Sequence, residues 1–567
     1  MKKAFLFIFI FFALKSSAQT FFPAKKYPAT SFRNPLDTTI MLVGNFGECR
    51  PNHFHSGIDI RTYGKENLTV RAIEDGFISR IKIEPGGFGN AIYVTHFNGY
   101  TSLYAHLNSF YPALENYVRN KQYDTKSWKQ DLHIAPHEFP VRKGEFIAKS
   151  GNTGSSQGPH LHMEIRDTKT DATLNGLLFY ESIKDTKPPY IKQLAVYDGN
   201  TSIYEQKPLL YAVKKEGNSF KLSPEKITIQ SSKAYLGIQG DDYMAIATGT
   251  LGIFETRVFV DEKPFFAWQM DNISYDVTRY MNAIADYKTK KNGGPWIQLC
   301  RKLPNDKLAV YKSFTESNGV IDLSDGQAKK IRIEVYDTKY NKTSLEFILQ
   351  GTNSFNPLTC NTLFKQGQKN ILKNKDIEFT LLESCLYDDI CFATSTKLSN
   401  LPYSNTYQVH YPYVPLHSYF DLTITPKSTI PISLQDKIAV VRLPYLNESG
   451  IKGKAAKFIN GQVVVSVRDF GEYQICIDQK PPVITSTIKN GDNVTKQRRI
   501  NFVIKEETTS VEHVEATIDG QWIRMVQKGN NYYYEMDDYF PKGSHQFKLT
   551  ARDENGNTYT QIYTLTR

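Results

Sequence analysis

Hydrophobic and polar residues alternate along most of the 567-residue chain. Segments such as GQVVVSVRD (461–469) and HQFKLTARD (545–553) carry apolar side chains at every second position. That period is the one expected of a strand with one buried face. Glycine, asparagine, aspartate and proline lie between these segments and are typical of turns. The pattern therefore predicts a mostly β protein, built from antiparallel sheets and β-sandwich modules.

One segment departs from this alternation. In FYPALENYVRNKQ (110–122), the residues Phe110, Leu114, Tyr117 and Val118 fall at helical spacing. Side chains three and four positions apart share one face of a helix. The segment therefore predicts a helix with an apolar stripe, which should pack against the body of the protein.

The start of the chain has a third pattern. Lys2 and Lys3 precede an apolar run from Ala4 to Leu14, which is followed by small residues ending at Ala18. This order is typical of a secretory signal peptide, and the run is too short to span a bilayer as a helix. We expect cleavage after Ala18 and no transmembrane anchor, which favours export to the periplasm, the cell surface or the medium.

Two Pro-Pro segments divide the rest of the chain. DTKPPYI begins at Asp185 and DQKPPVI at Asp478, and the sequence after each one later contains D-x-x-x-N. Such stiff segments are suited to linkers that open a module, and the shared motif predicts two copies of one β-sandwich. The last copy resembles bacterial immunoglobulin-like domains. The expected parts are 1–18 (signal peptide), 25–185, 186–352, 355–477 (β-rich, of unknown type) and 478–567.

Charge and cysteine content narrow the picture only slightly. The net charge of +11 becomes +8 without the three lysines of the signal peptide, which suits an anionic surface such as a cell wall. No basic run is dense enough to predict nucleic-acid binding. Disulfides are permitted in an oxidising compartment, and Cys385 and Cys391 are close enough in sequence to pair, although pairings cannot be read from spacing.

Candidate chemistry begins with GPHLHMEIR (158–166). His160 and His162 stand two apart in a predicted strand, so their side chains project from the same face. Both can converge on one metal ion, or one can bind it while the other faces its bound water. By itself such a pair is weak evidence, because most pairs of this kind are half-exposed polar positions.

A second segment, NHFHSGIDI (52–60), strengthens the metal hypothesis. His55 and Asp59 can supply two ligands and His162 a third, which leaves a fourth position open as in catalytic zinc sites. His53 is an alternative to His55 on this reasoning. His106, in YTSLYAHL, has a simpler interpretation as a histidine buried among tyrosines.

Taken together, residues from about 40 to 166 resemble the lysostaphin-type, or LytM-type, zinc metallopeptidases. The resemblance is carried by HSGID (55–59), by GGFGNAIYVTHFNGYTSLYAHL (86–107) and by SGNTGSSQGPHLHMEIR (150–166), with FGECR (46–50) before them. It covers about a quarter of the chain and implies an antiparallel β core with a groove for an extended peptide. It also implies Zn²⁺ as the cofactor, with His55, Asp59 and His162 as metal ligands and His106 and His160 as catalytic histidines.

These observations lead to one hypothesis and two alternatives. The hypothesis is an exported zinc metalloendopeptidase that hydrolyses cross-links or stem peptides of peptidoglycan. The alternatives are a non-enzymatic regulator or wall-binding protein, and a protease of exported proteins. The C-terminal modules offer surfaces for protein partners, and an insertion at 108–140, long for this family, is expected to line the groove.

Overall fold

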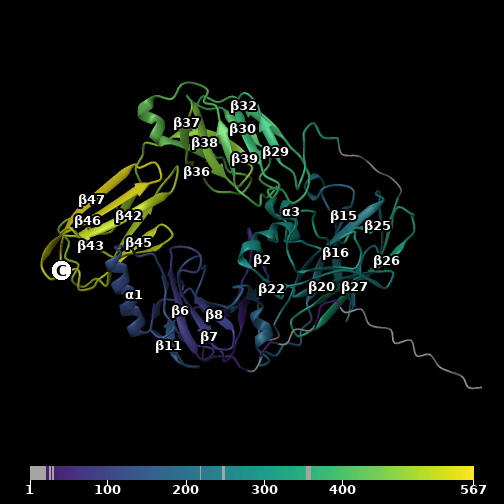
Figure 1. Ribbon diagram of the computed structural model, residues 1–567, viewed down its shortest axis with the longest axis horizontal. Helices are drawn as coiled ribbons and strands as arrows, with labels where there is room; N and C mark the ends of the chain where they lie inside the picture. The colour runs from purple at the N-terminus through teal and green to yellow at the C-terminus, as the bar shows by residue number, and fades with distance from the viewer. Residues whose placement is uncertain (1–20, 24–26, 29–30, 217–218, 245–248, 353–358) are drawn as a thin grey trace, which may run out of the picture.

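The computed structural model describes residues 21–23, 27–28, 31–216, 219–244, 249–352 and 359–567 (Figure 1). The predicted signal peptide lies outside these residues. Within them, antiparallel strands predominate and helices are few and short, which confirms the mostly β class. None of the helices in these ranges has the length and apolar character needed to cross a membrane.

The N-terminal part is organised around one antiparallel sheet with the order β1-β4-β13-β8-β7-β6-β10. Its strands are β1 (Leu42–Gly44), β4 (Ile58–Arg61), β13 (His160–Asp167), β8 (Tyr100–Ala105), β7 (Asn90–His96), β6 (Gly76–Ile83) and β10 (Gln130–His133). The short strands β11 (Pro140–Val141) and β14 (Thr173–Leu174) pair with β6 and β13. Apolar residues from these strands form one buried core with the nearby loops.

A second, smaller sheet and one helix pack against this core. The sheet has the order β5 (Thr69–Arg71), β12 (Phe146–Lys149) and β9 (Ser109–Phe110). The predicted helix is present as α1 (Pro112–Asp124), and Leu114 and Val118 on its apolar stripe are buried in the core. Proline at the first helical position is compatible with the helix because the N–H it lacks has no partner in the first turn.

The next part runs from β15 (Tyr190–Asp198) to β27 (Lys342–Gly351) and forms a twelve-stranded sheet. It contacts the N-terminal part through a strand pair and a shared core. The short strand β22 (Asn272–Ile273) pairs with β14, and Phe46 and Phe54 contribute to the core of this second part. That this part is a longer copy of the last β-sandwich remains a prediction, since its twelve strands form one sheet whereas the last module has two sheets of four.

The two remaining parts are each made of two sheets. Ten of the strands from β29 (Asn370–Lys373) to β39 (Gly471–Ile477) form two five-stranded sheets, while β31 (Ile390–Cys391) pairs with β28 (Leu363–Phe364). Strands β40 (Val483–Ser486) to β47 (Thr558–Thr566) form two four-stranded sheets. The suggested pairing of Cys385 with Cys391 is wrong. Cys391 forms a disulfide with Cys360, whereas Cys385 is a free, buried cysteine.

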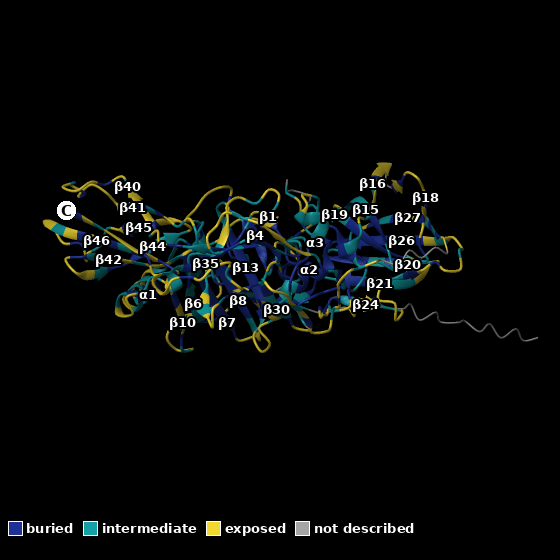
Figure 2. Ribbon diagram, turned by 90° about the horizontal axis from the view of Figure 1, so that it is seen from above, coloured by how far each residue is buried: buried dark blue, intermediate teal, exposed yellow. Residues whose placement is uncertain are grey.

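The four parts follow one another around a closed path, and the last returns to α1 of the first (Figure 1). Tyr123 stacks on Tyr539 with ring centroids 3.6 Å apart, and its hydroxyl donates to Asp537 at 2.8 Å. Lys528 donates to the backbone carbonyl of Asn152, in the loop before β13. We call these contacts the closure contact. Seen from above, buried residues run through the middle of the molecule, whereas β16 (Leu209–Glu216) is largely exposed (Figure 2).

Candidate metal centre

Two neighbouring strands bring three predicted ligands together. Asp59 on β4 lies opposite His162 on β13, and His55 precedes β4 by three residues. His55 Nε2 and His162 Nδ1 lie 3.0 and 2.9 Å from Asp59 Oδ1, and 3.0 Å from each other. All three residues are buried. The strand register, and not chance proximity, therefore sets this cluster.

The donor set fits a zinc ion. Two imidazole nitrogens and one carboxylate oxygen converge, each within 4.8 Å of the others, and three protein ligands of this kind leave a coordination position open. His53 is not in the cluster. It is exposed, and its Nδ1 lies 2.9 Å from the carbonyl of Pro51.

Each of the three ligands contacts a further group on the side away from the cluster. Arg50, from FGECR, donates to Asp59 Oδ2 at 2.7 Å, and the carbonyl of Asn45 lies 2.7 Å from His55 Nδ1. Glu164 Oε1 lies 3.2 Å from His162 Nε2. Such outer contacts fix the orientation of imidazole ligands and raise their basicity. The same carboxylates act on His162: burial lowers its pKa, but Asp59 and Glu164 more than offset this and raise it to about 9.

Gly57 allows β4 to approach β13 this closely. A Cβ at this position would lie 2.4 Å from the carbonyl oxygen of Met163 and 3.0 Å from His162 Cε1. Any side chain here would separate the two strands and move the ligands apart. The glycine of HSGID is therefore required by packing beside the cluster.

His160 and His106 lie next to the three ligands. His160 Nε2 is 3.4 Å from Asp59 Oδ1, and the centroids of the His106 and His160 rings are 4.8 Å apart. His160 Nδ1 lies 2.8 Å from the backbone carbonyl of Gly158, and His106 Nδ1 lies 2.9 Å from that of Thr153. A carbonyl can only accept a hydrogen bond, so Nδ1 carries the proton in both rings. Nε2 of each ring is then free to accept a proton.

Two tight loops place His106. Phe88 O accepts from the backbone N–H of His106 at 2.9 Å, and the loops at Gly89 and Gly154 touch so closely that a Cβ on either would meet the other's backbone nitrogen within 2.5 Å. His106 itself has a φ of 59°, in the left-handed region. Burial, followed by the neighbouring His162 and His160, lowers the pKa of His106 to about 3. The ring is therefore neutral in this environment.

Two residues that support the centre were missed in the sequence. Glu164 is fully buried and pairs with Arg166 Nε at 2.8 Å, and its position two residues after His162 was an available signal. Tyr275, on η3 (Tyr275–Tyr280) of the second part, donates to Glu164 Oε1 and lies 2.9 Å from Ser56 Oγ. No local pattern marks Tyr275, because its role arises only from the contact between the two parts.

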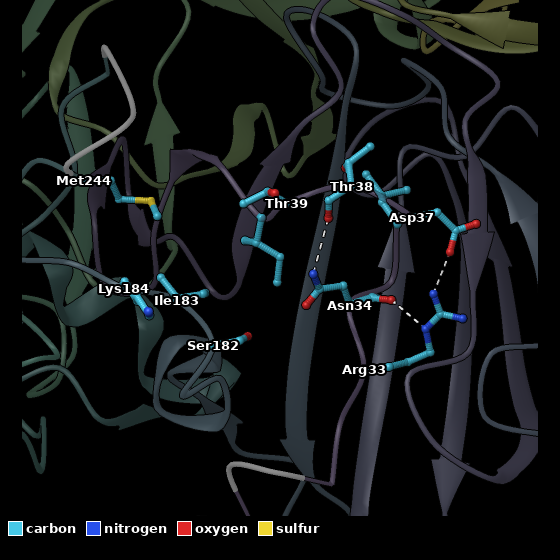
Figure 3. Close-up of a pocket in the computed structure, with 11 residues that line it drawn as sticks. Arg33, Asn34, Asp37, Thr38, Thr39, Ser182, Ile183, Lys184 and Met244 are labelled. Carbon is cyan, nitrogen blue, oxygen red and sulfur yellow. Dashed lines mark hydrogen bonds and ion pairs between the residues drawn. The ribbon is translucent and has the colours of Figure 1, made fainter.

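The predicted insertion at 108–140 lies partly at the edge of the sheet. Its strand β10 pairs with β6, and β7 and β6 separate it from β8, which leads to His106. A separate pocket of about 710 Å³ lies between residues 33–40 and 182–184 (Figure 3). None of the predicted site residues lines that pocket.

Comparison with family models assigns three regions. Residues 53–127 match the model of peptidase family M23, residues 361–478 the Zu5-like domain and residues 483–566 a bacterial Ig-like domain. The chain thus carries an M23 (LytM-type) peptidase domain and a C-terminal Ig-like domain. The Zu5-like match gives a family description to the β-rich region that the sequence left unassigned.

The relatives found by sequence match about a fifth of the chain. The DD-carboxypeptidase/endopeptidase Mpg of Neisseria meningitidis is 38% identical over 112 residues, which are 20% of this chain and 20% of the relative. An uncharacterized metalloprotease of Haemophilus influenzae is 32% identical over 119 residues, 21% and 19% of the two chains. The chain therefore spans about a fifth of the length of these curated relatives.

Solved structures give likenesses of similar extent. The catalytic domain of lysostaphin from Staphylococcus simulans is 21% identical with a TM-score of 0.18, over 24% of this chain and 87% of that one. A zinc-containing peptidase from Vibrio cholerae is 22% identical with a TM-score of 0.19, over 25% and 39%.

Proposed function

We propose that the protein is an exported zinc metalloendopeptidase that hydrolyses peptide bonds in the cross-links or stem peptides of peptidoglycan. The observation that carries the proposal is the convergence of His55, Asp59 and His162 beside two further imidazoles. The match to peptidase family M23 and the similarity to a DD-carboxypeptidase/endopeptidase support the choice of substrate.

The three ligands and the two histidines take different tasks in this proposal. Zinc held by His55, Asp59 and His162 would polarise the scissile carbonyl and acidify a water molecule. Nε2 of His160, which lies beside Asp59, is placed to accept the proton of the attacking water. His106 is neutral, and its ring is close enough to His160 to share in proton transfer or, once protonated, to donate to the tetrahedral oxyanion.

The burial of this group of residues contributes to the chemistry. Asp59 keeps its charge although it is buried. Burial raises its pKa, but His55, His160 and His162 together hold that pKa well below the ordinary value. A charged carboxylate in a desolvated site attracts a cation more strongly than one in water. The charged Asp59 carboxylate therefore favours binding of a metal ion at this site.

Two substitutions at the histidine pair test the assignment of roles. His162→Ala removes one of three ligands, so we expect loss of both zinc and hydrolysis. His160→Ala should keep its zinc and lose activity by about 10²–10⁴-fold, the usual contribution of a positioned acid or base. Zinc is measured by mass spectrometry of the purified protein, and cleavage by mass spectrometry of fragments from purified peptidoglycan. A His160→Ala protein without zinc, beside a fully loaded His162→Ala protein, would reverse the assignment.

The same assay separates the alternatives. Loaded protein that cuts denatured proteins but leaves peptidoglycan intact would indicate a protease of exported proteins. Protein that binds peptidoglycan without cutting either substrate would indicate a regulator or wall-binding protein. The masses of the fragments identify the bond that is cleaved.

A further inference from the structure

Three carboxylates converge where the peptidase part passes into the second part. Asp185 lies in the Pro-Pro segment, Asp242 follows β19 (Lys233–Asp241) and Asp337 follows β26 (Lys329–Tyr336). One oxygen from each lies within 4.8 Å of one from each of the others. Asp242 and Asp337 are 4% and 2% exposed, whereas Asp185 is only half-buried. The cluster is therefore buried on two sides, and Asp185 connects it to solvent.

One oxygen of the buried Asp242 carboxylate lacks a hydrogen-bond partner in the described part of the chain. Its Oδ1 is fully buried and has no hydrogen-bond partner among the described residues. Burial, and then the neighbouring Asp337 and Asp185, raises the pKa of Asp242 to about 8. A buried charge without a partner is costly, so an ionised Asp242 needs a positive group that the described side chains around it do not provide.

The nearby donors are already engaged elsewhere. Asp337 Oδ1 accepts from the backbone N–H groups of Lys339 and Asn341 at 2.8 and 2.9 Å, which explains its position in the turn. The side chain of Lys339 lies close enough to interact with Asp337 and Asp185, but its ammonium group donates to the carbonyl of Tyr180 at 2.9 Å. These contacts leave Asp242 Oδ1 without a donor among the described side chains, in a carboxylate that lies beside two others.

We propose that Asp185, Asp242 and Asp337 bind a divalent cation, preferentially Ca²⁺, which fixes the second part of the chain to the linker that leaves the peptidase. The ligand set is all carboxylate, and hard cations prefer oxygen, whereas zinc and copper favour nitrogen or sulfur. Ca²⁺ tolerates irregular geometry and several water ligands, which suits a site open at Asp185. This site is separate from the zinc centre and does not depend on the proposed function.

A related cluster in the last module provides an internal comparison. Asn557 Nδ2 donates to the carbonyl of Asp478 at 2.9 Å, as Asn341 Nδ2 donates to the carbonyl of Asp185 at 3.1 Å. The D-x-x-x-N motif therefore ties the Pro-Pro linker to its module in both places. The acidic groups near this second clamp are Asp478, Glu506 and Asp553.

The second cluster lacks the feature that points to a cation. Glu506 Oε1 accepts from the backbone N–H groups of Glu507 and Thr508 at 2.8 and 2.9 Å. Asp478 Oδ2 accepts from Thr509 Oγ1 at 3.3 Å. We therefore assign no ion to this cluster, and Glu506→Gln serves as the matched control.

The test uses the full mature protein with zinc already bound. Calorimetric titration with CaCl₂ should show one additional site per chain, with a Kd on the order of 10⁻⁴ to 10⁻³ M, as in extracellular calcium modules. Saturating Ca²⁺ should also raise the thermal unfolding midpoint, because a ligand that binds only the folded state stabilises it. Glu506→Gln should retain both effects.

Asp242→Asn distinguishes a cation site from a structural carboxylate. The variant should lose the Ca²⁺-dependent rise in unfolding midpoint yet be at least as stable as wild type without Ca²⁺, since the amide never places a charge beside Asp185 and Asp337. If Asp242→Asn does not fold, Asp185→Asn, at the solvent side, replaces it with the same expected loss of binding. The proposal is overturned if wild type gives neither heat nor a shift in midpoint, if the variants bind Ca²⁺ as wild type does, or if Mg²⁺ binds more tightly than Ca²⁺.

Discussion

Glu164 is the side chain through which Arg166 and Tyr275 act on the metal centre. It contacts His162 and pairs with the buried Arg166, and the hydroxyl of Tyr275 donates to it. The Glu164 carboxylate at Nε2 orients the His162 ring so that its Nδ1 points toward Asp59. The pKa of Glu164 is about 2. Burial raises that pKa, but Arg166 and then His162 more than offset this and lower it, so the group is an anion at neutral pH.

Glu164→Gln should therefore weaken zinc binding by about 10–100-fold, the usual effect of losing such an outer partner. The reason is that the neutral amide supports the His162 ring less strongly than a carboxylate does. Competition with a chromogenic chelator measures the affinity. An unchanged affinity would show that Glu164 serves only the fold.

Tyr275→Phe is the gentler companion variant. It removes the hydroxyl group that donates to Glu164. It keeps the aromatic ring, whose centroid lies 4.6 Å from the Arg166 guanidinium carbon. We expect a smaller fall in zinc affinity, with little change in the unfolding midpoint, because Tyr275 is 40% exposed.

At the level of single elements, α1 connects two parts of the molecule. Its inward stripe is buried in the peptidase core, and its last turn presents Tyr123 to the C-terminal module. The packing of α1 in the peptidase core therefore positions Tyr123 for the closure contact. The prediction that the insertion lines the groove remains a prediction, since β10 lies at the far edge of the sheet.

Leu114→Ala tests the inward stripe. Leu114 is fully buried, so the substitution should destabilise the protein by about 2–5 kcal/mol, the range for large-to-small changes in a core. Thermal or denaturant unfolding measures the loss. Asn120→Ala, on the exposed face of the same helix, is the control and should have little effect. Equal stability of the two variants would mean that α1 contributes little to the core.

At the scale of the whole molecule, the closure contact joins the first and last parts of the chain. Besides the Tyr123–Tyr539 stack, Arg524 Nη1 donates to Gln122 Oε1 at 3.3 Å. Lys528 reaches the loop that also carries Thr153, whose carbonyl holds His106. The last module is therefore fastened close to a loop of the candidate centre.

Tyr123→Ala should open this path. An aromatic pair contributes about 0.5–1.5 kcal/mol beyond its buried area, and the hydrogen bond to Asp537 is lost as well. Small-angle X-ray scattering should show a larger radius of gyration, with zinc content unchanged. Tyr559→Ala changes an exposed tyrosine in the same module and should keep the compact form. A Tyr123→Ala protein with the radius of wild type would show that other contacts suffice for closure.

The sequence predicted local features far better than distant contacts. The strand class, α1 and the grouping of His160 with His162 follow from periodicity, which depends only on neighbouring residues. His106 needed the resemblance to a family, because its left-handed backbone and the loops around it are not encoded in spacing. Tyr275 and the pairing of Cys391 with Cys360 depend on contacts across 111 and 31 residues. No periodic pattern reports such contacts.

The closed path also determines the effective concentration at which the last module meets α1. Because both belong to one chain, the module meets Tyr123 at an effective concentration that is set by the folded parts between them and not by the concentration of the protein. A contact too weak to join two separate proteins at micromolar concentration can therefore form within the intact chain. Opening and closing is thus a unimolecular equilibrium, which dilution of the protein does not change.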